Sequence, residues 1–65
     1  MDTGEFDPSP EELEAEFPGW EVFWGIASIV YARKLLSSPP IVLRDENTTE
    51  LRVKMRIKQQ ELSGR

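Results

Sequence analysis

The chain has 65 residues, of which 38% are apolar and 31% are charged, and a formal net charge of −4, with no cysteine and no histidine. This length allows one small domain, which buries only about 60% of the surface of its unfolded chain. Zinc fingers, iron–sulfur clusters, haem ligation by histidine and Ser/His/Asp or Cys/His catalysis all need imidazole or thiolate groups, so the composition excludes them. The sequence predicts no enzyme activity, no cofactor and no metal site.

Three features predict a cytoplasmic protein that does not enter membranes. The longest nearly uncharged apolar stretch, Val22–Ala32, has eleven residues, whereas a spanning helix needs about 20. The segment Met1–Glu5 lacks the basic and apolar regions of a secretory signal. The absence of cysteine fits a reducing compartment.

Charge is unevenly distributed along the chain. The first 19 residues contain seven acidic side chains and no Lys or Arg, so with a total of −4 the rest carries +3. We expect residues 1–9 to form a flexible acidic arm, residues 10–62 a single small α+β domain, and residues 63–65 a flexible tail. A solvated arm offers no pocket that would raise the pKa of a catalytic carboxyl group. We therefore interpret the carboxylates of this acidic segment as a solvated face; they belong to Glu11, Glu12, Glu14 and Glu16.

The first predicted element is a helix over residues 10–17. Ser9 and Glu12 have the spacing of a capping box, in which each side chain bonds the backbone amide of the other residue. Two turns of helix are marginal by themselves in water. Leu13 and Phe17 lie four residues apart, on one face, and we expect them to anchor the helix on the rest of the domain.

Three strands are predicted next. Trp20–Trp24 is aromatic and β-branched and lies between Pro18-Gly19 and Gly25, which favours a strand. Residues 29–35 form the second strand, with residues 25–28 as the hairpin connection, and Ile41–Arg44 forms the third. The alternative is one helix over residues 20–36, which would be apolar nearly all round and carry a glycine in its middle.

The last segment carries two conflicting signals. Residues 51–58 alternate apolar and basic side chains, which by itself favours a strand. Asn47 followed by Glu50 is typical of a helix start, and strong helix formers dominate as far as Leu62. We predict a helix over residues 48–62. Its main apolar stripe comprises Leu51, Met55 and Leu62, and a second face carries Val53 and Ile57.

The predicted order of elements defines an α+β fold. A short N-terminal helix precedes a three-stranded antiparallel sheet, and the C-terminal helix packs on that sheet. Four runs resemble small uncharacterised actinobacterial proteins over about residues 8–58; they are Phe17–Phe23, Tyr31–Arg33, Ser38–Arg44 and Glu50–Arg52. The resemblance implies a compact domain of unassigned function, with no catalytic residues to carry over.

A looser similarity is to the three-strand-plus-helix layout of plant AP2 DNA-binding domains and integrase arm-binding domains. Those families present several Arg and Trp residues from the sheet. Only Arg33, Lys34 and Arg44 lie on predicted strands here, so the chain departs from that pattern.

Our first hypothesis is a non-enzymatic protein-interaction module that binds another protein or itself, with no small-molecule substrate. Strand alternation places Phe23 on the other face of its strand from Trp20 and Trp24. With Tyr31 beside it, the Phe23 ring would form an exposed patch. Val53 and Ile57 would leave branched apolar side chains on the outer face of the last helix, which favours a two-fold homodimer. The candidate interaction surface therefore comprises Phe23, Tyr31, Val53 and Ile57.

The alternative is a nucleic-acid-binding module of three-strand-plus-helix type, with the acidic arm modulating access. Its candidate contacts are Arg33, Lys34, Arg44, Arg52, Arg56 and Lys58. Convergence of these side chains on one concave face would favour nucleic acid, whereas scatter would favour a protein partner. The net charge of −4 opposes approach to a phosphate backbone, so we expect nucleic acid not to be the partner.

Overall fold

The computed structural model describes residues 7–64 and has the predicted α+β fold. In chain order its elements are α1 (Pro10–Glu16), β1 (Trp20–Trp24), the 3-10 helix η2 (Ile26–Ser28), β2 (Val30–Lys34), β3 (Ile41–Asp45) and α2 (Thr48–Ser63). The hairpin interpretation of the central segment is confirmed, and the single long helix is wrong. The helical interpretation of the last segment is also confirmed.

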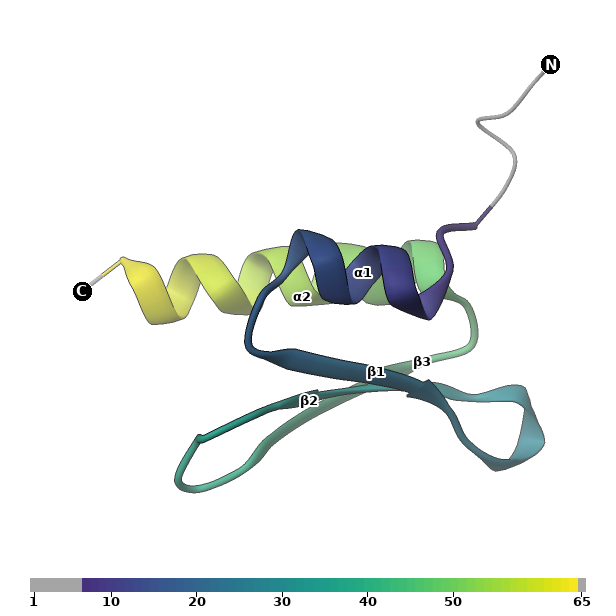
Figure 1. Ribbon diagram of the computed structural model, residues 1–65, viewed down its shortest axis with the longest axis horizontal. Helices are drawn as coiled ribbons and strands as arrows, with labels where there is room; N and C mark the ends of the chain where they lie inside the picture. Colours follow the sequence, from purple (N-terminus) through teal and green to yellow (C-terminus); the bar gives the residue numbers. More distant parts are fainter. Residues whose placement is uncertain (1–6, 65) are drawn as a thin grey trace, which may run out of the picture.

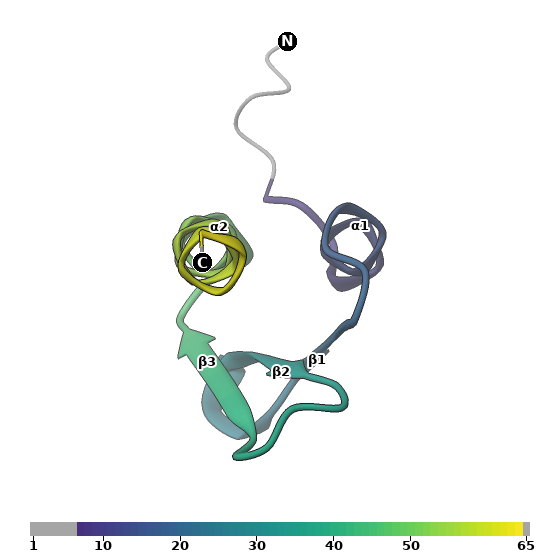
Figure 2. The ribbon, with the colours of Figure 1, turned by 90° about the vertical axis from the view of Figure 1, so that its left-hand side faces the viewer.

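The sheet has the order β1-β2-β3, with both strand pairs antiparallel. Figure 1 shows both helices on the same side of this sheet, and the end-on view in Figure 2 shows them side by side above it. The molecule is therefore two layers thick. No element in residues 7–64 covers the other face of the sheet.

The start of α1 follows the predicted capping box. The Ser9 hydroxyl oxygen accepts a hydrogen bond from the Glu12 amide at 3.1 Å, and the Glu12 carboxylate accepts one from the Ser9 amide at 3.0 Å. Residues 1–6 of the predicted flexible arm lie outside the described residues. Asp7 lies close to the domain, because its carboxylate accepts a hydrogen bond from the hydroxyl group of Thr49 in α2.

The start of α2 is fixed by Asn47, whose side chain accepts a hydrogen bond from the Glu50 amide at 2.8 Å. The helix buries only some of the apolar residues of this segment. Leu51 and Met55, one turn apart, are completely buried, whereas Val53 and Ile57 are exposed. The helix ends at Ser63, the first residue of the predicted flexible tail; Arg65 lies outside the described residues.

The core lies between the two helices and the sheet. Both predicted anchors of α1 belong to it, since Leu13 is completely buried and Phe17 nearly so. The full buried set is Leu13, Phe17, Trp20, Val22, Val30, Ala32, Leu51 and Met55. Leu62 was expected in the apolar stripe of α2, but it is exposed. Figure 1 shows that the C-terminal part of α2 runs past the end of the sheet.

Candidate functional site

The uncovered face of the sheet, called the open face below, is the candidate site. Because side chains alternate along a strand, every second residue of each strand points to this face. The register aligns them in two rows across the sheet. One row is Phe23, Tyr31 and Arg44, and the other is Glu21, Arg33 and Val42.

Two of the three residues in one row of the open face are aromatic. The rings of Phe23 and Tyr31 are stacked, with centroids 5.7 Å apart and planes inclined by 14°. Phe23 is 41% exposed and Val42 is 53% exposed. Gly25 allows this arrangement, because a Cβ atom there would lie 2.9 Å from Cδ1 of Tyr31 and closer still to Cε1. The predicted pairing of Phe23 with Tyr31 is therefore present, on the side of the sheet without helices.

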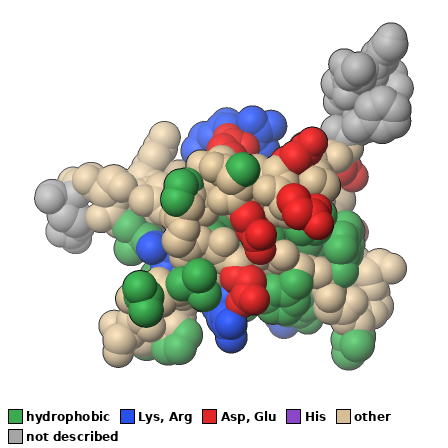
Figure 3. Space-filling model, viewed as in Figure 1, with side chains coloured by type: hydrophobic (Ala, Val, Ile, Leu, Met, Phe, Trp, Pro, Cys, Tyr) green, Lys and Arg blue, Asp and Glu red, His purple; other side chains and the backbone are tan. Residues whose placement is uncertain are grey.

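Two turns extend the apolar surface at opposite ends of the open face. Both the connection over residues 35–40 and the one that contains η2 bend away from the helices (Figure 1). Leu36 is fully exposed in the first turn and has a left-handed backbone with φ 56°, which is costly for a branched L-residue. Ile26 is almost fully exposed in the second turn. Figure 3 shows hydrophobic side chains at both ends of the lower margin, on this side of the sheet.

The edges of the sheet are less available than its open face, because a side chain from a helix occupies each edge. The Glu14 carboxylate accepts a hydrogen bond of 2.8 Å from the Val22 amide of β1. The Lys54 ammonium group donates one of 2.9 Å to the Arg44 carbonyl of β3. Unpaired edges are where foreign strands add to a sheet, so these two contacts oppose strand addition at both edges.

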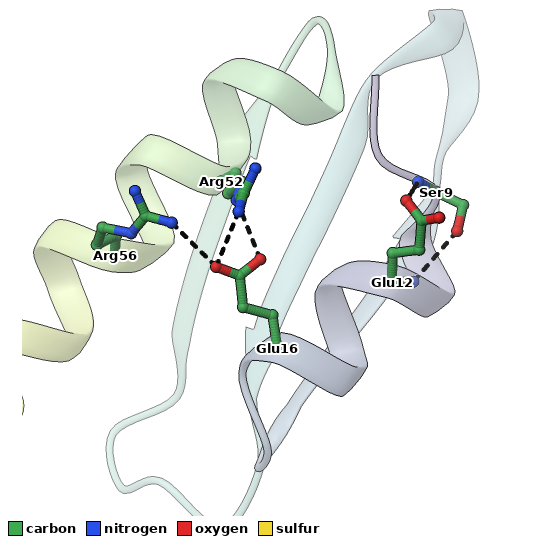
Figure 4. A network of polar contacts seen from close by, with 5 residues as sticks. All are labelled: Ser9, Glu12, Glu16, Arg52 and Arg56. Atoms are coloured by element: carbon green, nitrogen blue, oxygen red, sulfur yellow. Dashed lines mark hydrogen bonds and ion pairs between the residues drawn. The ribbon is translucent and has the colours of Figure 1, made fainter. Parts of the chain in front are cut away.

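Charged contacts bridge the two helices. Figure 4 shows Glu16 of α1 between Arg52 and Arg56 of α2, with N–O distances of 3.0 Å and 2.9 Å. Burial by itself would raise the pKa of Glu16, but the hydrogen bonds and positive charges of the two arginines outweigh it and lower this pKa below its ordinary value. A hydrogen bond from Lys54, at 2.9 Å, likewise lowers the pKa of Asp45.

The basic side chains proposed for nucleic-acid contact do not converge. Two of them, Arg52 and Arg56, form ion pairs with Glu16 between the helices. Arg33 pairs with Glu21 on the open face, and Lys58 pairs with Glu61 at 3.0 Å on α2. Lys34 lies on the helix-covered side of the sheet by strand alternation. Arg44 is the sixth; it lies on the open face and makes no ion pair within the described part of the chain.

The structure separates the predicted interaction residues into two surfaces. Phe23 and Tyr31 lie together on the open face. Val53 and Ile57 form a second surface, called the α2 ridge below, and are 48% and 53% exposed. At about 100° per residue they lie roughly 120° to 160° around the helix from the buried Leu51 and Met55. The ridge therefore points away from the sheet. A single two-fold interface cannot include both the open face and the α2 ridge, because they lie on opposite sides of the molecule.

Three apolar residues of the candidate site were not predicted: Ile26, Leu36 and Val42. The signal for Val42 was available, since alternation within the third strand puts it opposite Ile41 and Leu43. Leu36 and Ile26 had no such signal, because exposure at a turn depends on where the turn points.

Other features of the described residues add little chemistry. An open pocket of about 470 Å³ lies at the β3 edge of the sheet, lined by Ile29, Tyr31, Arg44, Asp45, Glu46 and Lys54. No three His, Cys, Asp or Glu side chains of residues 7–64 gather where they could hold a metal ion. None of the helices in this range has the length and apolar character needed to cross a membrane.

Comparison of the chain with known protein families, with curated proteins and with solved structures finds no match. The resemblance to small actinobacterial proteins stays a prediction. The functional argument therefore rests on the open face itself.

Proposed function

We propose that this protein is a non-enzymatic protein-interaction module that binds its partner through the open face. The observation that carries the proposal is the stacked, part-exposed pair of Phe23 and Tyr31 on the helix-free side of the sheet, with exposed Val42 diagonal to Tyr31. Contiguous exposed apolar surface rimmed by polar residues is typical of protein-binding sites.

The composition of the open face supports this proposal. An antiparallel sheet whose second face meets water normally carries polar side chains there. Here three of the six positions are Phe, Tyr and Val, and the other three are charged. Interfaces between proteins are enriched in aromatic residues and arginine, and both occur on this face. We also propose that the protein acts in the cytoplasm, which its cysteine-free composition supports.

Nucleic acid remains the second candidate, and no observation favours it. Most of its proposed basic contacts form ion pairs with carboxylates of the same chain. Binding to a phosphate backbone would weaken steeply with salt, since each neutralised phosphate releases a counterion.

A capture experiment with matched variants tests the proposal. Val42→Lys and Val53→Lys make the same change at similar exposure, one on the open face and the other on the α2 ridge. We expect tagged wild type and Val53→Lys to retain the same proteins from a host lysate, including untagged copies of the chain, and Val42→Lys to lose them. Equal retention by all three chains would contradict the proposal. Retention of nucleic acid that disappears with salt or nuclease would favour the alternative.

A further inference from the structure

We propose that the occupant of the open face is a second copy of this chain, placed face to face about a two-fold axis that runs across the strands. This inference rests on the proposed function, because it names the partner of the same surface. The result would be four layers, with the two sheets in the middle and the helices outside. Aligned sheets pack in this way about 10 Å apart.

Charge favours this axis over a two-fold axis along the strands, which would also keep the two sheets aligned. A two-fold axis along β2 would place Arg33 opposite Arg33 of the second copy, and like charges across an interface are costly. An axis across the strands, between the two rows, instead lays each strand over its own counterpart in reverse. Arg33 then faces Tyr31 of the second copy, where a guanidinium group and an aromatic ring attract each other. Glu21 stays beside Arg33, so this ion pair is preserved.

The remaining facing pairs are also free of like charges. Val42 of one copy faces Arg44 of the other, whose aliphatic stem can cover it. Glu21 faces Phe23 of the second copy. The axis across the strands therefore brings no like charges together, whereas the axis along β2 sets the two Arg33 side chains opposite each other.

The two axes differ in which turns they bring together. Reversing the strands brings the turn of residues 35–40 of one copy against the η2 turn of the other. The two most exposed large apolar side chains of the described residues, Leu36 and Ile26, lie at the tips of these turns. The axis across the strands therefore sets Leu36 of each copy against Ile26 of the other, so this contact occurs twice per dimer. The axis along β2 would instead set each turn against its own counterpart.

The size of the open face predicts weak association. Three strands of five residues have a footprint of about 14 by 17 Å, well below the about 800 Å² that each partner buries in a standard interface. The two turns enlarge this area. We therefore expect a reversible dimer with an affinity in the micromolar range or weaker.

Sedimentation of wild type, Val42→Lys and Val53→Lys at several concentrations tests the partner. We expect Val53→Lys to dimerise like wild type and Val42→Lys to dimerise at least about tenfold more weakly, since it buries an unpaired charge in the interface. Dimers lost in Val53→Lys and kept in Val42→Lys would overturn the inference in favour of the α2 ridge. Loss in both, with recovery of a one-to-one complex on mixing them, would show head-to-tail contact instead.

Two further results complete this test. Circular dichroism identifies any variant that fails to fold; Leu36→Asn, on a turn outside the sheet, then replaces Val42→Lys and is expected to weaken the dimer as well. A wild type that stays monomeric at every concentration would overturn the inference. The proposed function would still stand if a different protein were captured by wild type and lost by Val42→Lys.

Disulfide trapping tests the axis, because the chain has no cysteine of its own. We expect chains carrying Leu36→Cys to form disulfides with chains carrying Ile26→Cys faster than either forms with itself. Faster pairing of Leu36→Cys chains with one another would contradict the axis across the strands.

Discussion

The attachment of α1 can be tested by asking whether packing or charge holds it. Leu13 is completely buried in the core, and α1 has only seven residues, too few for a stable helix by itself. Replacing a buried leucine by alanine costs about 2 to 5 kcal/mol. A domain of this size has a total stability of about 3 to 10 kcal/mol. We therefore expect Leu13→Ala to lower the unfolding temperature by at least about 8 °C, measured by thermal unfolding followed by tryptophan fluorescence.

The matched control removes the charged contact of the same helix. Glu16 and its two arginine partners are all partly exposed, and ion pairs of this kind contribute about 0 to 1 kcal/mol. Glu16→Gln should therefore cost less than Leu13→Ala, and 0.5 M salt should leave most of the stability of wild type. A larger loss in Glu16→Gln, or a wild type that salt destabilises as much as Leu13→Ala does, would refute the argument that packing holds α1.

Three further predictions concern the open face and acid stability. Gly25→Ala should displace the Tyr31 ring and cost about 1 to 3 kcal/mol by overpacking; an unchanged near-ultraviolet circular dichroism spectrum would argue against it. Leu36→Asn should stabilise the fold by about 1 kcal/mol, because asparagine tolerates the left-handed backbone, while weakening association; lower stability in thermal unfolding would show that Leu36 packs against its own domain. The pKa values of Glu16 and Asp45 are lowered by folding, so stability should be constant above about pH 5 and fall as pH drops through these lowered pKa values; acid titration of Glu16→Gln should show a smaller fall, and an identical fall would contradict that assignment.

Local chemistry accounts for the parts of the fold that the sequence predicts well. The capping box at Ser9 and the cap at Asn47 fix helix starts through contacts three residues away. The alternation of residues 51–58 would give a strand only if all four of its apolar residues were buried on one face. The structure buries Leu51 and Met55, which are a helical turn apart, and leaves Val53 and Ile57 exposed.

The position of the open face could not be predicted in the same way. It depends on α1 and α2 packing on the same side of the sheet, and the contacts that join the two helices link residues far apart in the chain, such as Glu16 and Arg52. The contacts of Lys54 illustrate the difference. Helix periodicity favours a pair with Glu50, but Lys54 contacts Asp45 and the Arg44 carbonyl, because the edge of β3 lies beside α2. The separation of Phe23 and Tyr31 from Val53 and Ile57 has the same origin.

The most direct test of the central claim is a nuclear magnetic resonance dilution series on the full chain. We predict that the amide signals of Phe23, Tyr31 and Val42 shift with protein concentration over the micromolar to millimolar range, as expected for a small interface. The signals of Val53 and Ile57 should stay constant. Shifts confined to α2, or an open face whose signals do not change at any concentration, would contradict the claim that this face binds a second copy of the chain.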